Sequence, residues 1–392
     1  MQFLSSLASH VGNLCLRWKQ FPYSHHFSSS PNSHSRGQLI DFLKKQGFPK
    51  SQAVSMVGRF PHVGSLDRPR TVVQLFRNLG FSDSQIRSSI RVLPQIIFCD
   101  ATKNLEPKIR FLEELGFSGS ALPKFLSKNS SVMSLSLKKR LIPSTEIIKT
   151  ILSPNDENNK ELVKVLSRCS WLLNRDPNAY LLPNIAYLKS CGIVGSQLAF
   201  LLKKQPRLLI SEENKLRVYV SRALDLGFSV NSGMLAHAVH ALSCLSEKTF
   251  DRKMKTFLDH GFSEDQTREM IRRAPGLVRC STDKLKLGME FYMETMGIKR
   301  ETLVKRPCML MHSMEERVIP RVKVLQVLRG KGLLKKKEPS VLEMLQLSEK
   351  DFLEKFISRF GDEHTMDLLV AYKGHLVDAS DTSSGSCSSS DD

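Results

Sequence analysis

Positive charge gathers beside regularly placed prolines in this chain. A lysine or arginine stands within three residues of Pro94, Pro206, Pro275 and Pro307. Cations that recur at one structural phase suit a phosphate backbone, because each can neutralise one phosphate and release its counterion. Basic residues also lie near Pro143 and Pro320. We predict nucleic-acid contacts at Arg91, Lys138, Lys139, Arg140, Lys203, Lys204, Arg207, Arg272, Arg273, Lys305, Arg306, Arg321 and Lys323.

The charge balance of the whole chain points to the same kind of partner. The 392 residues include 58 Lys and Arg against 39 Asp and Glu, a net charge of +19. The segment 1–40 carries +3 and the segment 374–392 carries −4, which leaves +20 on residues 41–373. A basic body of this kind indicates a polyanionic partner, most simply nucleic acid.

No arrangement of residues predicts catalysis. The chain has no phosphate-cradling glycine loop, no His-Glu-x-x-His sequence and no nucleophile elbow. His237 and His240 share a helical face but have no third ligand nearby, and no Cys-x-x-Cys pair occurs among the eight cysteines, which we expect to be reduced core residues. We therefore predict a protein that is not an enzyme and that uses neither a cofactor nor a metal.

The element that must position the basic residues is a repeat. Glycines recur at a period near 35 residues, and Gly80, Gly192 and Gly261 each precede a proline by fourteen residues. One longer interval fits two periods, with a degenerate marker near Leu152. Such a period predicts an all-α, superhelical solenoid of stacked helical repeats. The marker glycines are at positions 47, 80, 116, 192, 227, 261, 297 and 332.

Each repeat can be read residue by residue between 80 and 116. Ser82 and Gln85 predict a capping box at the start of a first helix, which Pro94 ends. An irregular stretch over 95–105 should follow. A second helix then begins at Pro107 and stops at Gly116, which suits a left-handed C-terminal position. Phenylalanines after the glycines are predicted core residues, which argues against a stacking platform for single strands.

The two ends of the chain differ from the repeats. Residues 1–40 contain no acid, are rich in serine and place apolar residues on one helical face, as an organellar transit peptide does. Residues 41–373 form the predicted repeat array. Residues 374–392 are rich in Ser and Asp and predict a disordered tail. No run of 18 apolar residues exists, so we predict no membrane span.

The repeat marks resemble the mitochondrial transcription termination factor (mTERF) family in its plant form. The resemblance covers about residues 40 to 375 and rests on Leu93-Pro94-Gln95-Ile96-Ile97, on Leu115-Gly116-Phe117 and on the late segment Ile319-Pro320-Arg321-Val322. It implies three-helix repeats in which a short helix follows each proline, and a concave basic groove. Repeats that lack the proline, at Ser130, Ser170 and Ser243, depart from the pattern.

The resemblance implies a regulator of organellar gene expression that binds double-stranded DNA and controls transcription termination or initiation. An RNA-binding splicing or processing factor is the alternative, and a protein-binding helical scaffold is an alternative of another class. The expected partners are organellar double-stranded DNA or structured RNA, with the organellar transcription machinery as a further partner. We expect a monomer in the mitochondrion, with the chloroplast as the alternative.

Overall fold

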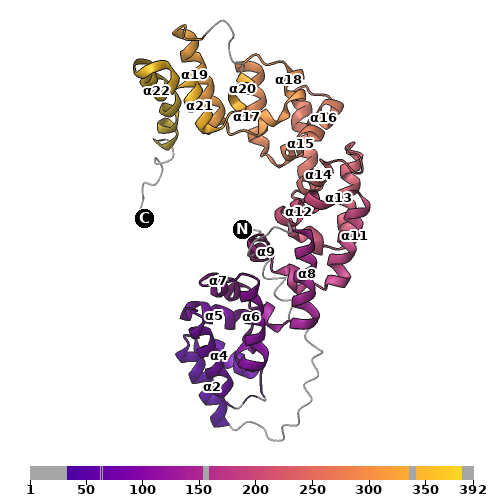
Figure 1. Cartoon of the computed structure of the whole chain (residues 1–392), viewed down its shortest axis with the longest axis vertical. Helices are drawn as coiled ribbons and strands as arrows, with labels where there is room; N and C mark the ends of the chain where they lie inside the picture. The colour runs from indigo at the N-terminus through magenta and orange to yellow at the C-terminus, as the bar shows by residue number, and fades with distance from the viewer. Residues whose placement is uncertain (1–32, 62, 64, 153–158, 335–340, 382–392) are drawn as a thin grey trace, which may run out of the picture. The chain divides into compact units, whose positions relative to one another are not determined.

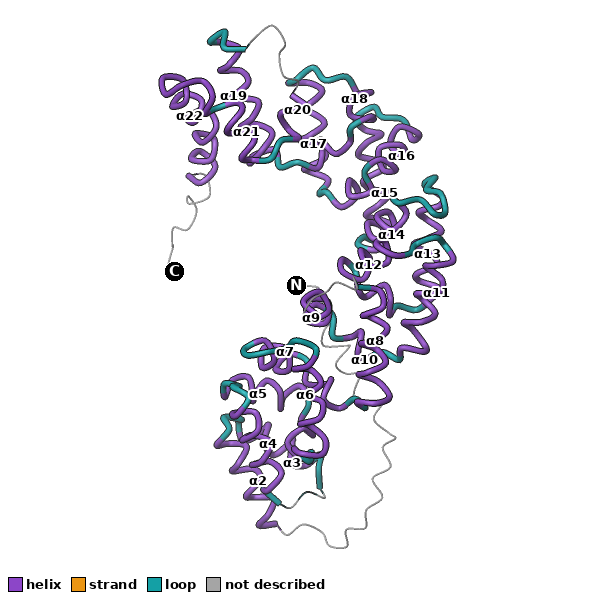
Figure 2. The backbone as a smooth tube through the Cα atoms, viewed as in Figure 1, coloured by secondary structure: helices purple, strands orange, loops and turns teal. Residues whose placement is uncertain are grey.

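The computed structural model describes residues 33–61, 63, 65–152, 159–334 and 341–381. Every regular element in these residues is a helix, and Figure 2 draws helices and loops without a strand. The all-α solenoid class predicted from the sequence is confirmed. None of the described helices is long and apolar enough to cross a membrane.

The chain divides into two compact units, residues 1–137 and residues 138–392. Successive helices carry successive colours in Figure 1. The first unit contains α2 (Ser33–Lys45), α3 (Lys50–Gly58), α4 (Asp67–Asn78), α5 (Asp83–Val92), η2 (Pro94–Phe98), η3 (Ala101–Leu105), α6 (Glu106–Glu114), α7 (Ala121–Lys128) and η4 (Ser130–Ser134).

The second unit continues the same alternation of helices and short turns. After η5 (Leu137–Leu141), which starts at the boundary, come α8 (Ile142–Ile151), α9 (Lys160–Arg168), α10 (Trp171–Asn174), η7 (Pro177–Leu181), α11 (Leu182–Ser190), α12 (Gly195–Lys204), η8 (Pro206–Ile210), α13 (Glu213–Asp225), α14 (Leu235–Ser243), α15 (Glu247–Asp259), α16 (Glu264–Arg273), η9 (Pro275–Arg279), α17 (Thr282–Glu290), η10 (Phe291–Thr295), α18 (Arg300–Lys305), η11 (Pro307–Met311), η12 (Met314–Val318), α19 (Ile319–Gly330), α20 (Val341–Gln346), α21 (Glu349–Phe356), η13 (Ser358–Phe360) and α22 (Gly361–Asp381).

The marker glycines end the second helices in the conformation that the sequence requires. All eight of them have positive φ, from 63° at Gly297 and Gly332 to 101° at Gly116. At Gly80 the amide of Phe81 then donates to the carbonyl of Phe76 at 3.0 Å, which closes the helix end. The capping box also forms, because the Ser82 hydroxyl accepts from the Gln85 amide and the Gln85 side chain accepts from Ser82.

A short helix follows most first helices, as the resemblance implies, and we call it the elbow. Elbows start at Pro94, Ser130, Trp171, Pro206, Pro275 and Pro307. At Ser130 the hydroxyl donates to the Leu126 carbonyl at 2.6 Å, so a serine competes for the helical acceptor and ends the helix where a proline would. After Ser243 the chain instead turns at Cys244 and starts α15. The elbow is missing at that repeat.

The stretch 95–105 is more regular than the sequence predicted. It forms the elbow η2 and then a single π-helical turn, η3, that leads directly into α6. Asp100 starts this turn, because its carboxylate accepts from the Lys103 amide at 2.9 Å. The second helix therefore begins before Pro107, and the cause is an Asp cap rather than the proline.

Most elbows are held by a donor from the second helix of the repeat before them. Asn184 donates to the carbonyls of Leu209 and Ser211 at 3.1 and 2.8 Å. Lys108 donates to the Met133 carbonyl at 2.5 Å, and Lys253 donates to the Cys280 carbonyl. Each of these three donors lies eight residues before a marker glycine. They satisfy carbonyls that a short helix leaves without a partner, and so they join neighbouring repeats.

The helices extend beyond both predicted boundaries of the repeat array, residues 41 and 373. The first helix, α2, starts at Ser33, inside the predicted transit peptide, and its Leu39 is fully buried. At the other end α22 continues to Asp381, into the predicted disordered tail, from a helix that buries Leu368 and Tyr372 in the C-terminal core. Residues 1–32 of the predicted transit peptide and 382–392 of the predicted tail lie outside the described residues.

The cysteines only partly match their prediction as core residues. Cys169 is buried, whereas Cys244 and Cys308 are exposed. Cys308 follows Pro307 at the start of an elbow, where the apolar positions that face the core are Met309 and Leu310. The six described cysteines are all free thiols, so the repeats are stabilised by packing and by hydrogen bonds between neighbours.

Substitution of a marker glycine tests the backbone argument. Gly80 has a φ of 79°, and a Cβ added there would meet nothing within 4 Å. We expect Gly80→Ala to lower the free energy of unfolding by about 1–2 kcal/mol through backbone strain alone. Gly58 ends α3 without a positive φ and is equally uncrowded, so Gly58→Ala should be neutral or slightly stabilising. Equal effects of the two variants in urea unfolding would contradict this account.

Candidate nucleic-acid interface

Basic residues mark the end of one kind of helix. Five of the six helices that precede elbows end at Lys128, Arg168, Lys204, Arg273 and Lys305, and all five side chains are exposed. The sixth, α5, ends at Val92, directly after the exposed Arg91. We use the name elbow cations for the lysines and arginines within three residues of an elbow's first residue. They are Arg91, Lys128, Arg168, Lys203, Lys204, Arg207, Arg272, Arg273, Lys305 and Arg306.

The helix dipole alone does not explain this pattern. A cation is favourable at the C-terminus of any helix, by about 0.3–1 kcal/mol. Four of the second helices nevertheless end in acids, at Glu114 in α6, Asp225 in α13, Asp259 in α15 and Glu290 in α17, whereas α2, α4, α8, α11 and α19 carry a lysine or arginine in the last turn. Acids therefore end only some of the second helices, whereas five of the six helices before elbows end in a cation. Exposed cations that recur beside the elbows are what a polyanionic partner would favour.

Several elbow cations have no carboxylate partner in the described part of the chain. Arg91, Lys204, Arg207, Lys305 and Arg306 are exposed and make no ion pair there. Arg207 lies beside the Cys169 thiol. Charges without an internal partner are those that a phosphate can pair with, so these residues are the strongest candidates for contacts.

Other predicted contacts are occupied within the fold. Lys203 pairs with Glu161 at 2.7 Å, and Arg140 pairs with Asp176 at 3.3 Å. Glu269 accepts from Arg272 and Arg273 at 2.5 and 2.7 Å, and the hydrogen bond from Arg272 is the main cause that lowers the pKa of this carboxyl group. Arg272 also packs over Gly227 and donates to the Leu226 carbonyl at 3.5 Å, so it joins two repeats.

Arg321 is not a surface contact, and its assignment from the sequence was wrong. Its side chain is 1% exposed. The guanidinium donates to the carbonyls of Met344 and Leu347 at 2.6 and 2.9 Å and lies 4.5 Å from the Phe352 ring. It also pairs with Glu349 at 3.2 Å. A phosphate could not reach this group without unfolding the C-terminal core.

The reason for that error is that the chain has two classes of proline. Pro94 and its equivalents start elbows, whereas Pro143 and Pro320 lie in the first turn of the second helices α8 and α19. Lys138, Lys139 and Arg140 precede Pro143 within η5, and Lys323 lies within α19 and is half-buried. These residues are therefore in a different phase from the elbow cations, although Lys138 and Lys139 are exposed.

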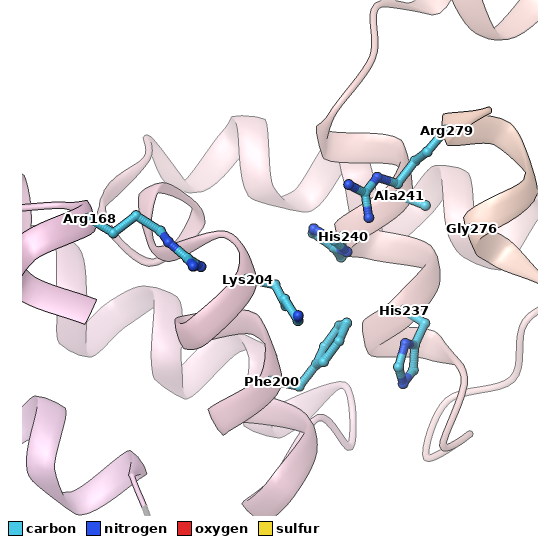
Figure 3. Close-up of a pocket in the computed structure, with 8 residues that line it drawn as sticks. All are labelled: Arg168, Phe200, Lys204, His237, His240, Ala241, Gly276 and Arg279. Atoms are coloured by element: carbon cyan, nitrogen blue, oxygen red, sulfur yellow. The ribbon is translucent and has the colours of Figure 1, made fainter. Parts of the chain in front are cut away.

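A hollow opens among the elbow cations of the second unit. Its volume is about 430 Å³, and it is lined by Arg168, Phe200, Lys204, His237, His240, Ala241, Gly276 and Arg279. These residues come from α9, α12, α14 and η9. Figure 3 shows the side chains of Lys204, His240 and Arg279 directed toward a common space, with the Arg168 side chain extending toward it from α9. No carboxylate is among the lining residues.

Histidine and phenylalanine rings form one wall of the hollow. The Phe200 ring lies 4.1 Å from the His237 ring and meets the His240 ring edge-on at 5.4 Å, centroid to centroid. Burial, with Arg279, His237 and Lys204 nearby, lowers the pKa of His240 to about 4. The imidazole is therefore neutral at physiological pH. No group of three or more potential metal ligands occurs in the described residues.

The low pKa of His240 predicts acid sensitivity. Its ordinary pKa is 6.5 and its pKa in the folded chain is about 4, so the unfolded chain binds more protons between these values. Stability should be complete above pH 6.5 and fall by about 2–3 kcal/mol as the pH drops toward 4. His240→Gln should remove most of that loss in urea unfolding measured from pH 4.5 to 7.5. An unchanged pH slope in the variant would contradict the assignment.

Sequence reasoning missed three exposed cations. Lys128 and Arg168 lie two residues before Ser130 and Ser170, the positions where the chain lacks the elbow proline. Counting from the serine as from the proline would have found both. Arg279 is the last residue of η9 and follows no periodic signal. Only the folded arrangement brings it beside Lys204.

Comparison with known proteins gives two findings. A family model described as mTERF matches residues 73–232 and 235–353, more than half of the chain. The curated protein "Transcription termination factor MTERF8, chloroplastic" of Arabidopsis thaliana is 23% identical over 303 residues. That alignment covers 76% of this chain and 59% of the relative, so the chain matches less than two thirds of the relative's length.

Proposed function

The chain belongs to the mTERF family, and from this premise we propose that it binds double-stranded DNA of an organelle through its elbow cations and so controls transcription. Proteins of this family are in general nucleic-acid-binding regulators of organellar gene expression. The observation that carries the proposal is the recurrence of an exposed cation beside each of the six elbows, several of them without an ion pair in the described residues.

Duplex rather than single-stranded nucleic acid is the favoured target. The recurrent phenylalanines Phe48, Phe81, Phe117, Phe228 and Phe262 are all buried, so they offer no stacking surface for exposed bases. The elbow cations recur at the repeat period and can follow a phosphate backbone, which both DNA and RNA duplexes present. Structured RNA, and with it splicing or processing, is the second candidate.

A protein-binding scaffold is supported less well. A scaffold surface would carry apolar or mixed-charge residues along the repeats. The elbows instead expose Lys204, Arg207, Lys305 and Arg306 without carboxylate partners in the described residues. We propose a binding role as a monomer, with the organellar transcription machinery as a further partner.

The organelle is a separate part of the proposal. The mitochondrion was the expectation from the sequence, whereas the Arabidopsis relative is named chloroplastic. We propose an organellar location with these two compartments as the candidates. Imaging of the full chain fused to a fluorescent protein in plant cells distinguishes them, and a signal outside both organelles would contradict the proposal.

Binding titrations test the nucleic-acid proposal. The purified chain is titrated with DNA and RNA duplexes of matched sequence at several salt concentrations. We expect log affinity to fall linearly with log salt, because each phosphate contact contributes about 0.9 to the slope for duplex DNA. Tighter DNA binding supports transcription control, and tighter RNA binding supports splicing or processing. An affinity that does not fall with salt would overturn both.

A further inference from the structure

The hollow between α9, α12, α14 and η9 concentrates positive charge around one space, which general contact with nucleic acid does not require. Three cations, Arg168, Lys204 and Arg279, line one space of about 430 Å³. Arg168 donates one N–H to the Lys203 carbonyl, and its positive charge is not neutralised by any ion pair in the described residues. Lys204 and Arg279 likewise make no ion pair there. Bringing three like charges together is unfavourable unless an anion binds between them.

The chemistry of the hollow excludes a metal ion and favours an anion. His237 and His240 would be the only metal ligands in the lining, and the positive charges of Lys204 and Arg279 would repel a cation from them. The same two cations and the Arg168 guanidinium are all donors. Guanidinium and ammonium groups bind phosphate oxygens with strong, charge-assisted hydrogen bonds.

We propose that this hollow is a specific site for one phosphate group, held by Lys204 and Arg279 with Arg168 at the rim. This site would refine the proposed function, and it rests on that function only in the assumption that the phosphate belongs to a nucleic acid. The volume lies within the range of small-ligand pockets, about 300–1,000 Å³, so a phosphate can enter with the sugar attached to it. Backbone, strand-end and free-nucleotide phosphates share the chemistry that the site recognises.

His240 reports occupancy of the site. Arg279, His237 and Lys204 face its ring from η9, α14 and α12, and with burial they keep it neutral. A bound phosphate opposes these positive charges and favours the protonated imidazole, so the pKa of His240 should rise from about 4 when the anion binds. Diffuse counterions around the protein would not give a saturable change in the pKa of one histidine ring.

The test follows the histidine ring resonances of the full chain by NMR during titration with inorganic phosphate. Ionic strength is kept constant with chloride. We expect saturable shifts of His237 and His240 and a rise in the pKa of His240. The double variant Lys204→Gln, Arg279→Gln should weaken phosphate binding about tenfold or more. Lys286→Gln removes an exposed charge on α17 outside the hollow and should change nothing.

Three further ligands identify the source of the phosphate. A shift of His240 with adenosine monophosphate indicates a free nucleotide, a shift with a 5′-hydroxyl duplex indicates a backbone phosphate, and a shift only with a 5′-phosphorylated duplex indicates a strand end. Each supports the site. Shifts that increase linearly with phosphate, or that chloride reproduces, would overturn it. If the phosphate site fails in this way, a steep salt dependence of duplex binding would still uphold the proposed function. Saturable phosphate binding without duplex binding would uphold the phosphate site and contradict the proposed function.

Discussion

Replacement of Lys204, Arg207, Lys305 and Arg306 by Gln should weaken duplex binding about 100-fold or more at moderate salt. Each of these exposed cations can form a charge-assisted contact with a phosphate, and such contacts contribute about 1.5–3 kcal/mol when fully formed. The slope of log affinity against log salt should also become shallower, by about 3.6, as four counterion-releasing contacts are lost. Fluorescence anisotropy with a labelled duplex measures both quantities.

A matched variant separates position from charge. Lys215, Lys248, Arg252 and Lys286 are exposed, make no ion pair in the described residues and lie on the second helices α13, α15 and α17. Their replacement by Gln gives the same loss of four charges. We expect it to change affinity only a few-fold, through the general field. Equal loss in the two quadruple variants would mean that net charge, and not the elbows, determines binding.

Arg321→Met should destabilise the C-terminal repeats by about 3–5 kcal/mol while leaving duplex affinity unchanged at temperatures where the variant is folded. Removal of the buried guanidinium leaves the Met344 carbonyl without its side-chain donor and Glu349 without its ion pair, while the Leu347 carbonyl keeps the hydrogen bond from Arg317. Arg321→Lys keeps the charge but not the forked geometry and should give an intermediate loss. Urea unfolding monitored by circular dichroism measures these differences.

The control for Arg321 is Arg306, a proposed nucleic-acid contact that should not stabilise the fold. Arg306 is exposed and makes no ion pair in the described part of the chain, so Arg306→Gln should leave the free energy of unfolding within about 0.5 kcal/mol of the original. The two arginines thus predict opposite outcomes. A stable Arg321→Met variant with weakened duplex binding would show that the guanidinium contacts nucleic acid after all.

The repeat could be predicted because its boundaries depend on local backbone chemistry. Glycine at 80 or 116 is required by a positive φ, and proline at 94 cannot continue a helix, so both leave a periodic mark. The capping box at Ser82 is local in the same sense. At Ser243 the sequence shows only that the proline is absent. That absence alone does not predict that the chain turns directly into α15 without an elbow.

The roles of the basic residues could not be predicted, because they depend on the neighbouring repeat. Lys108 and Lys253 count toward the net charge of residues 41–373, yet the amine of each donates a hydrogen bond to a carbonyl of the next elbow. Desolvation lowers the pKa of both amines. Arg321 resembles an elbow cation in sequence and is buried in the fold. Charge counted along the chain therefore overstates the charge that a partner can reach.

The most direct measurement of the central claim is lysine footprinting. The chain is acetylated briefly with and without a bound duplex, and modification at each lysine is quantified by mass spectrometry. Lys128, Lys204 and Lys305 end helices before elbows, whereas Lys215, Lys248 and Lys286 are also exposed but lie on second helices. We predict protection of the first three lysines and unchanged modification of the other three. Uniform protection, or protection of the second set alone, would contradict the assignment of the elbows as the nucleic-acid interface.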